Sequence, residues 1–164
     1  MAIPAAANAQ SAANTEAAAA EEEPVRDVRF RGLLLDRFAQ GTRPVRFHSQ
    51  EDGPQTLRLS STFLSQPTRY VGPDPLVFQG EEADAIVGTC RLPIGLDEAI
   101  LLFSPGGTNE AGETRFRVRA YPDTFARAPL GTYRFFNFTD QRLAIDLQGT
   151  RSLIEPNDNQ GIRP

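Results

Sequence analysis

Few side chains in this sequence could carry catalytic chemistry. It holds one histidine, His48, and one cysteine, Cys90. His48 is followed by a Ser-Gln-Glu-Asp run, which is typical of a strand that ends in a polar surface loop, and no G-x-S-x-G motif supplies a serine nucleophile. One thiol and one imidazole form neither an internal disulfide nor a structural zinc site. We therefore expect no catalytic residue, no cofactor and no metal ligand, with His48 at the surface.

Cys90 and Asn137 each sit in a pattern that has a structural and a chemical interpretation. Cys90 precedes Arg91, whose charge would lower a thiol pKa if the two side chains met. Neighbours on a strand point to opposite faces, so we expect Cys90 to be a small buried apolar residue. Asn137 begins an Asn-Phe-Thr glycosylation sequon within or at the end of a predicted strand, and we interpret this match as chance.

Carboxylates are the remaining candidates for catalysis. A glycosidase needs two of them held about 5–10 Å apart. A polysaccharide hydrolase using Glu110 and Glu113 as acid and base therefore stays open as an alternative function. Equally, these acids are explained as solvated charges opposite seventeen arginines. The acids placed on predicted loops are Glu81, Glu82, Asp84, Asp97, Glu98, Glu110 and Glu113.

The glycine-rich segment 104–112 precedes a strand rather than a helix and lacks the G-K-[ST] ending of a phosphate-binding loop. We predict a long hairpin loop there, and this loop is one place where a partner could bind.

The composition excludes several classes of protein. All seventeen basic residues are arginine, and the first 23 residues hold four acids and no base. The remaining 17 acids (21 less 4) balance the 17 arginines from Pro24 onward, and no arginine cluster typical of a phosphate-binding surface is present. The longest apolar runs, 32–35 and 99–103, are far shorter than the roughly 20 residues of a transmembrane helix. We expect neither nucleic-acid binding nor a transmembrane segment.

The N-terminal segment is rich in alanine and glutamate, with no apolar stripe to bury, so we expect it to be disordered. Ala7-Asn8-Ala9 followed by Gln10 fits the small-x-small pattern of a signal-peptidase site. Only six residues precede this pattern, as they would if the true start codon lay upstream. This favours export to the periplasm or medium. The alternative is the low-complexity tail of a cytoplasmic protein.

The rest of the sequence has the rhythm of short strands separated by Pro, Gly, Asn and Asp. In segment 113–121 arginines alternate with Phe116, Val118 and Ala120, which predicts a strand with one solvated face. Segment 99–103 is continuously apolar and predicts a strand buried on both faces. No segment has the apolar stripe of a helix. The predicted strands are 28–35, 56–63 (with Leu57, Leu59, Ser61 and Phe63 on one face), 75–78, 85–92, 99–103, 113–121, 132–139, 143–147 and, more weakly, 152–154.

One stretch resembles a known class of domain. Ala-Pro-Leu-Gly-Thr-Tyr-Arg-Phe at 128–135 is similar to the approach to a late strand in fibronectin type III and other immunoglobulin-like domains. That resemblance implies that Tyr133 is a structural corner residue whose hydroxyl bonds to a nearby backbone group. The continuation through 147 resembles uncharacterised exported bacterial β-sandwich proteins, for which no activity is implied. The chain lacks the core tryptophan and the cysteine pair of true immunoglobulin domains.

These observations predict an all-β protein, an antiparallel, immunoglobulin-like β-sandwich of roughly eight or nine short strands. We expect a disordered segment over 1–23, the sandwich over 24–155 and a flexible tail over 156–164. The expected function is that of a non-enzymatic, exported binding or structural module in the bacterial cell envelope, with an unknown protein or envelope partner. A strand edge left unpaired after Leu153 and Ile154 would also be a place for self-association.

Overall fold

The structure is a computed structural model that describes residues 25–36, 39, 41–81, 85–110 and 112–164. The predicted disordered segment 1–23 lies outside these residues. The described chain is all-β, without a helix, and contains twelve strands rather than eight or nine. The strands are β1 (Arg26–Leu34), β2 (Thr42–Ser49), β3 (Gly53–Ser60), β4 (Thr68–Gly72), β5 (Leu76–Gln79), β6 (Ile86–Cys90), β7 (Glu98–Thr108), β8 (Thr114–Pro122), β9 (Tyr133–Phe136), β10 (Leu143–Leu147), β11 (Thr150–Ile154) and β12 (Asn159–Ile162).

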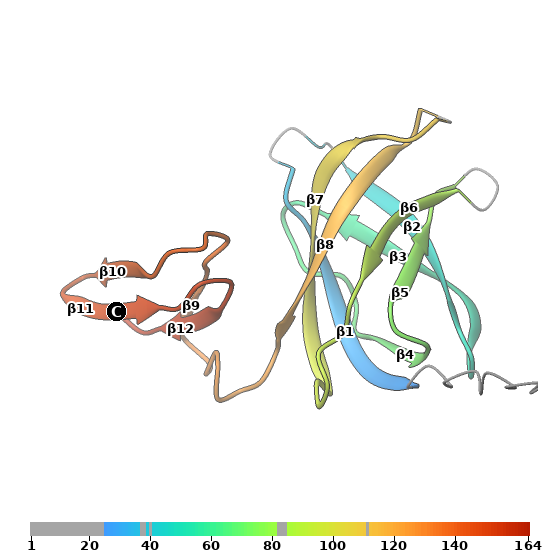
Figure 1. Cartoon of the computed structure of the whole chain (residues 1–164). Coiled ribbons are helices and arrows are strands. Elements are labelled where there is room, and N and C mark those ends of the chain that lie inside the picture. The colour runs from blue at the N-terminus through green and yellow to red at the C-terminus, as the bar shows by residue number, and fades with distance from the viewer. Residues whose placement is uncertain (1–24, 37–38, 40, 82–84, 111) are drawn as a thin grey trace, which may run out of the picture.

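Strands β1 to β8 form a two-sheet domain, shown on the right of Figure 1. One sheet has the order β4-β1-β7-β8 and the other the order β3-β2-β5-β6. All neighbours in these sheets are antiparallel except β1 and β7, which run parallel from Arg29 opposite Glu98 to Leu34 opposite Phe103. The expectation of a purely antiparallel sandwich is therefore wrong at this pair.

A single apolar core fills the space between the two sheets. At its centre, aromatic rings from both sheets meet at tilted or edge-to-face angles, the arrangement that the ring quadrupole favours. The rings are those of Phe30, Phe47, Tyr70, Phe78 and Phe103. On β8, Phe116 and Val118 pack against this core while Arg115 and Arg117 are exposed, so the predicted alternation is confirmed.

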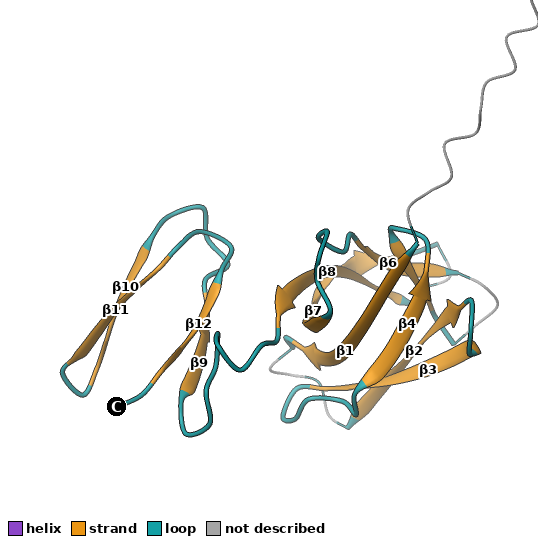
Figure 2. Cartoon of the chain, turned by 90° about the horizontal axis from the view of Figure 1, so that it is seen from below, coloured by secondary structure: helices purple, strands orange, loops and turns teal. Residues whose placement is uncertain are grey.

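Strands β9 to β12 form what we call the C-terminal unit, residues 133–164, which stands beside the two-sheet domain (Figures 1 and 2). It consists of two antiparallel pairs, β9 with β12 and β10 with β11. The tail expected to be flexible over 156–164 instead contains β12, in which Asn159 and Ile162 are buried. Pairing with β9 supplies the order that these mostly polar residues do not encode themselves.

Several predicted boundaries change in the structure. The continuously apolar segment 99–103 is buried on both faces, as expected, within β7. Strands β2 and β4 had no counterpart among the predictions. Phe63, which the sequence predicts to share one face of a strand with Leu57 and Leu59, lies beyond β3 and is mostly exposed. The long loop predicted over 104–112 is a tighter turn, because β7 continues through Thr108 and β8 begins at Thr114.

Candidate binding surface on the C-terminal unit

The one histidine and the one cysteine lie on different strands. His48 is exposed near the end of β2, as predicted. Cys90 is buried on β6, also as predicted, with 1% of its surface exposed. Burial, reinforced by the negative charge of Asp74, raises the pKa of the Cys90 thiol to about 12. A thiol with this pKa is a packing residue, since the thiolate is the nucleophile.

The two carboxylates of the hydrolase alternative have different surroundings. Glu113 closes the β7–β8 turn: its backbone N–H donates to Asn109 Oδ1 at 2.8 Å, and its carboxylate accepts from Asn109 Nδ2 at 3.2 Å. Glu113 lines a depression with Glu81 and Arg43. Glu110 is exposed at the turn and lines another depression. The structure does not bring Glu110 and Glu113 into one cleft.

The other acids singled out in the sequence lie away from this turn or outside the described residues. Asp97 and Glu98 lie at the other end of β7 from the β7–β8 turn. Glu82 and Asp84 lie outside the described residues.

Asn137 has a definite structural role, whereas the sequence pattern suggested only a chance sequon. Its side chain is fully buried, and Nδ2 donates to the carbonyl oxygens of Gln141, Ile154 and Glu155 at 2.6–3.2 Å. Its Oδ1 accepts from the backbone N–H and the hydroxyl of Thr139. The amide thus connects the chain before β10 to the end of β11.

Tyr133 does not form the corner that the immunoglobulin resemblance implies. Its side chain is 61% exposed, and no hydrogen bond joins its hydroxyl to a described residue. A bond of this kind occurs instead at Tyr70, whose buried hydroxyl donates to the carbonyl oxygen of Pro73 at 2.6 Å. The expected structural role of Tyr133 is therefore wrong.

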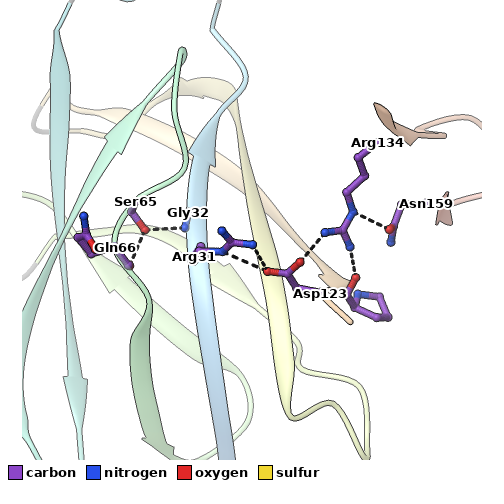
Figure 3. Close-up of polar contacts among 8 residues, drawn as sticks. Arg31, Gly32, Ser65, Gln66, Asp123, Arg134 and Asn159 are labelled. Carbon is purple, nitrogen blue, oxygen red and sulfur yellow. Dashed lines mark hydrogen bonds and ion pairs between the residues drawn. The ribbon is translucent and has the colours of Figure 1, made fainter. Parts of the chain in front are cut away.

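Charged hydrogen bonds attach the C-terminal unit to the two-sheet domain (Figure 3). Asp123, just after β8, accepts from Arg31 of β1 through one carboxylate oxygen and from Arg134 of β9 through the other, at 2.5 Å to each guanidinium. Arg134 also donates to the Pro122 carbonyl and to Asn159 of β12. Burial acts to raise the pKa of Asp123, but the hydrogen bonds and charges of Arg31 and Arg134 outweigh it, so that pKa is lowered.

Aromatic packing completes this attachment. The ring of Tyr121, on β8, meets Phe136 edge-to-face at 5.2 Å and Phe138 at 6.1 Å. Phe136 packs over the outer face of the β4-β1-β7-β8 sheet, where Ile100 and Leu102 are buried beside Tyr121. This explains why β7 is apolar on both faces: one side faces the core and the other lies beneath the C-terminal unit.

The sequence patterns did not identify this junction. Arg31 and Asp123 are 92 positions apart, and no local motif links them. The one pattern that pointed to it is the continuous apolar run 99–103, which requires a cover on its second face.

The C-terminal unit has little core of its own. Its fully buried apolar side chains are Ile154 and Ile162, whereas several large apolar side chains on it or just before it are exposed. A surface on which such side chains gather is typical of a protein-interaction site. The exposed ones are Leu130, Tyr133, Phe138, Leu143 and Leu153.

The β10–β11 hairpin carries two of these side chains, Leu143 and Leu153, one on each of its faces. Leu153, 58% exposed, lies opposite Ala144, and together they form the apolar centre of the outer face of the hairpin. Ion pairs flank this centre: Asp146 with Arg151 at 3.1 Å on one side, and Arg142 with Glu155 at 2.9 Å on the other. We call this group the hairpin face. A shallow depression covers most of it and extends to Ile145 and Ser152.

No protein-family model, curated protein or solved structure matches this chain. Within the described ranges, no three His, Cys, Asp or Glu side chains lie close enough together to hold a metal ion. The part of the chain that the structure describes also contains no helix of the length and apolarity needed to cross a membrane.

Proposed function

We propose that this protein is a non-enzymatic, exported binding or structural module of the bacterial cell envelope, and that its C-terminal unit binds another protein. In this proposal the two-sheet domain is a scaffold with a complete core. The C-terminal unit presents the hairpin face to the partner.

The balance of buried and exposed apolar side chains on the C-terminal unit carries the proposal. Tyr133, Phe138, Leu143 and Leu153 are exposed over a stretch of about thirty residues in which two apolar side chains are fully buried. Burying a large apolar side chain contributes about 1.5–3 kcal/mol, so a partner that covered Leu153 on the hairpin face would gain appreciable binding energy. The ion pairs beside Leu153 form a polar rim of the kind found around interface cores.

The non-enzymatic part of the proposal is supported by the positions of the candidate catalytic groups. The thiol of Cys90 is buried, His48 is exposed on a strand, and Glu113 is engaged in closing a turn. Export is supported by the Ala-x-Ala pattern at 7–9. An immunoglobulin-like origin of the two-sheet domain belongs to the same proposal, supported by its two four-stranded sheets over one core.

Site-specific photo-cross-linking in the producing cell tests the proposal. A benzoyl-phenylalanine in place of Leu153 is expected to give a cross-linked product that contains a second protein chain. The matched control places the same probe at Arg58, an exposed position on the edge strand β3, where no product is expected. Cell fractionation of the same cultures is expected to recover the protein outside the cytoplasm.

Three outcomes would contradict the proposal. Equal cross-linking at positions 153 and 58 would mean that the C-terminal unit is not a specific binding surface. Recovery of the protein in the cytoplasm would contradict export. Release of reducing sugar from envelope polysaccharide by the purified protein, abolished by E113Q, would establish the hydrolase instead.

A further inference from the structure

The outer edge of β10 is bare. Its sheet has two strands, so β10 has β11 on one side, and none of the backbone hydrogen bonds outside the strand ladders involves residues 143–147 among the described part of the chain. Natural proteins protect such edges with proline, lysine, bulges or a covering segment. β10 has no proline or bulge, and its one charge, Asp146, is paired with Arg151.

In the neighbouring pair, β9 with β12, the outer edge of β12 is covered by another segment of the chain. The N–H of Gly161 on β12 donates to the Arg127 carbonyl at 2.6 Å, so the chain before β9 covers that edge. Thr132, on the same segment, lies so close to Gly161 that an added Cβ there would be 2.6 Å from its hydroxyl oxygen. Among the described residues, no backbone hydrogen bond covers the outer edge of β10 in this way.

The turn of the hairpin decides which backbone groups point outward. Gln148 and Gly149 both have positive φ, 51° and 87°, which is the two-residue type I′ turn of a hairpin. In such a turn the flanking residues Leu147 and Thr150 bond to each other, and bonded pairs then alternate along the ladder. Ala144 and Asp146 consequently direct their N–H and C=O groups to the bare edge.

We propose that a second copy of this chain occupies this edge, its β10 running antiparallel with Ala144 opposite Ala144 of the other copy. This goes beyond the proposed function, because a second copy paired at this edge lies beside the hairpin face and does not cover Leu153. The two-fold symmetric arrangement forms a four-stranded sheet, β11-β10-β10-β11, that closes on itself as an isologous dimer.

Several alignments of the two β10 strands would pair their outward N–H and C=O groups. The charges of Arg142 and Asp146 favour this register over the others. With Ala144 opposite itself, Arg142 of each copy lies opposite Asp146 of the other. A shift that placed Asp146 opposite itself would set two like charges against each other, which is destabilising. A shift that centred the pair on Ile145 would leave Asp146 opposite Ala144, with no charged partner across the interface.

The side chains of the hairpin face then form complementary rows across the four strands. The central row is apolar: Leu153 and Ala144 of one copy, then Ala144 and Leu153 of the other. Each flanking row alternates in charge: Glu155, Arg142, then Asp146 and Arg151 of the other copy. On the opposite side of the sheet, Leu143 of each copy lies across from Ile145 of the other.

Charge-reversed variants of the full chain test the register. R142D or D146R alone places like charges opposite each other at both contacts of the dimer and is expected to raise its dissociation constant at least about tenfold in analytical ultracentrifugation. An equimolar mixture of R142D with D146R places opposite charges at both contacts, so the mixture is expected to regain dimer. A mixture that stays monomeric while the wild type is dimeric would overturn the register.

Cysteine cross-linking provides a measurement that does not depend on charge. In A144C the two new thiols face each other across the two-fold axis, about 5.5 Å apart at Cα, within the range of a disulfide. Air oxidation is expected to give a covalent dimer. L153C is the matched control. In the dimer, three strand spacings of about 4.8 Å separate position 153 of one copy from position 153 of the other, which is too far for a disulfide. The native Cys90 is buried and is expected to remain reduced in both.

A144P separates edge pairing from folding. Proline at position 144 removes an outward N–H and no bond within the hairpin, so the variant is expected to be a monomer with unchanged circular dichroism. A wild-type chain that is monomeric at all concentrations would overturn the dimer. If position 153 then still cross-links to a different protein, the proposed function stands without it; if it cross-links to nothing, both fail.

Discussion

Asp123 links the two parts of the molecule through charge, because each of its carboxylate oxygens accepts from an arginine on a different unit. The side chains of Asp123 and Arg134 are mostly buried. D123N removes the negative charge and leaves two guanidinium groups close together. We expect it to lower the free energy of unfolding by roughly 1–3 kcal/mol, the usual cost of depriving a buried charged donor of its acceptor. Urea denaturation followed by circular dichroism measures this loss.

The matched control is D27N. Asp27 also pairs with an arginine, Arg69 at 2.7 Å, but both side chains are about half exposed. Exposed ion pairs contribute little because solvent screens them. A loss in D27N as large as that in D123N would mean that burial at the junction does not matter.

The contribution of Asp123 also depends on pH in a definite direction. Its pKa is lowered in the folded protein from an ordinary value of 3.8, so the stabilisation is fully present above pH 3.8 and is lost as pH falls below it towards the folded pKa. The difference in unfolding free energy between wild type and D123N is therefore expected to narrow below pH 3.8. Urea titrations between pH 7 and pH 2.5 check this, and a gap that widened towards low pH would have the wrong sign.

Cys90 is predicted to be unreactive in the native protein. Its thiol is buried and has a pKa of about 12, so almost no thiolate is present at pH 8. Ellman's reagent is expected to detect one thiol per chain in guanidinium chloride and essentially none over minutes without it. Rapid reaction of the native chain would mean that the Cys90 thiol is accessible to solvent and could act as a nucleophile.

At the scale of elements, the two sheets approach each other closely where β1 crosses β3. A Cβ added to Gly32 would lie 2.7 Å from Leu59 and 2.8 Å from Leu57, both fully buried. The backbone around Gly32 is also held by Ser65, whose hydroxyl accepts from the Gly32 N–H at 2.8 Å (Figure 3). G32A is therefore expected to force the sheets apart and lower the free energy of unfolding by about 1–3 kcal/mol.

Thermal unfolding measures the effect of G32A against the control G106A. An added Cβ at Gly106 meets the flexible Arg117 side chain at 3.3 Å on an exposed part of β7, where the neighbour can move. Equal destabilisation by both changes would show that the cost belongs to glycine replacement in a strand rather than to the sheet contact.

The elements that the sequence predicted well are those with strong local patterns. β8 followed from its arginine alternation, and β10 was predicted with the bounds that the structure has. β2 was missed although it alternates, because its start carries Arg43 and Pro44, which resemble a loop. β12 was missed because its order comes from β9 and from the Arg127 carbonyl, both distant in the sequence.

The candidate site was predictable only in part. The sequence identified residues 143–147 as a strand and raised self-association through a terminal edge after Ile154. In the structure β11 is not the last strand, because β12 follows it and continues the unit. The edge proposed for self-association is therefore that of β10. Which apolar residues stay exposed depends on how the C-terminal unit docks on Tyr121, and no local pattern encodes that contact.

At the scale of the whole molecule, the two units depend on each other unequally. The two-sheet domain has a closed core of its own, while the C-terminal unit is ordered by the Asp123 junction and by the ring contact of Phe136 with Tyr121. The chain between them, residues 123–132, carries the exposed Phe125 and Leu130. Loss of docking should therefore release the C-terminal unit and leave the larger domain folded.

Limited trypsin digestion of F136A tests this asymmetry. Phe136 is half-buried against Tyr121, so its loss is expected to favour undocking by about 2 kcal/mol, and each 1.4 kcal/mol raises the undocked population tenfold. Cleavage after Arg127 or Arg134 should accelerate accordingly, and mass spectrometry should show a stable fragment containing β1 to β8. F138A is the control: Phe138 lies farther from Tyr121, at 6.1 Å, and is already 44% exposed, so a much smaller acceleration is expected. If F136A were instead digested throughout the two-sheet domain, the larger domain would depend on the C-terminal unit for its own folding.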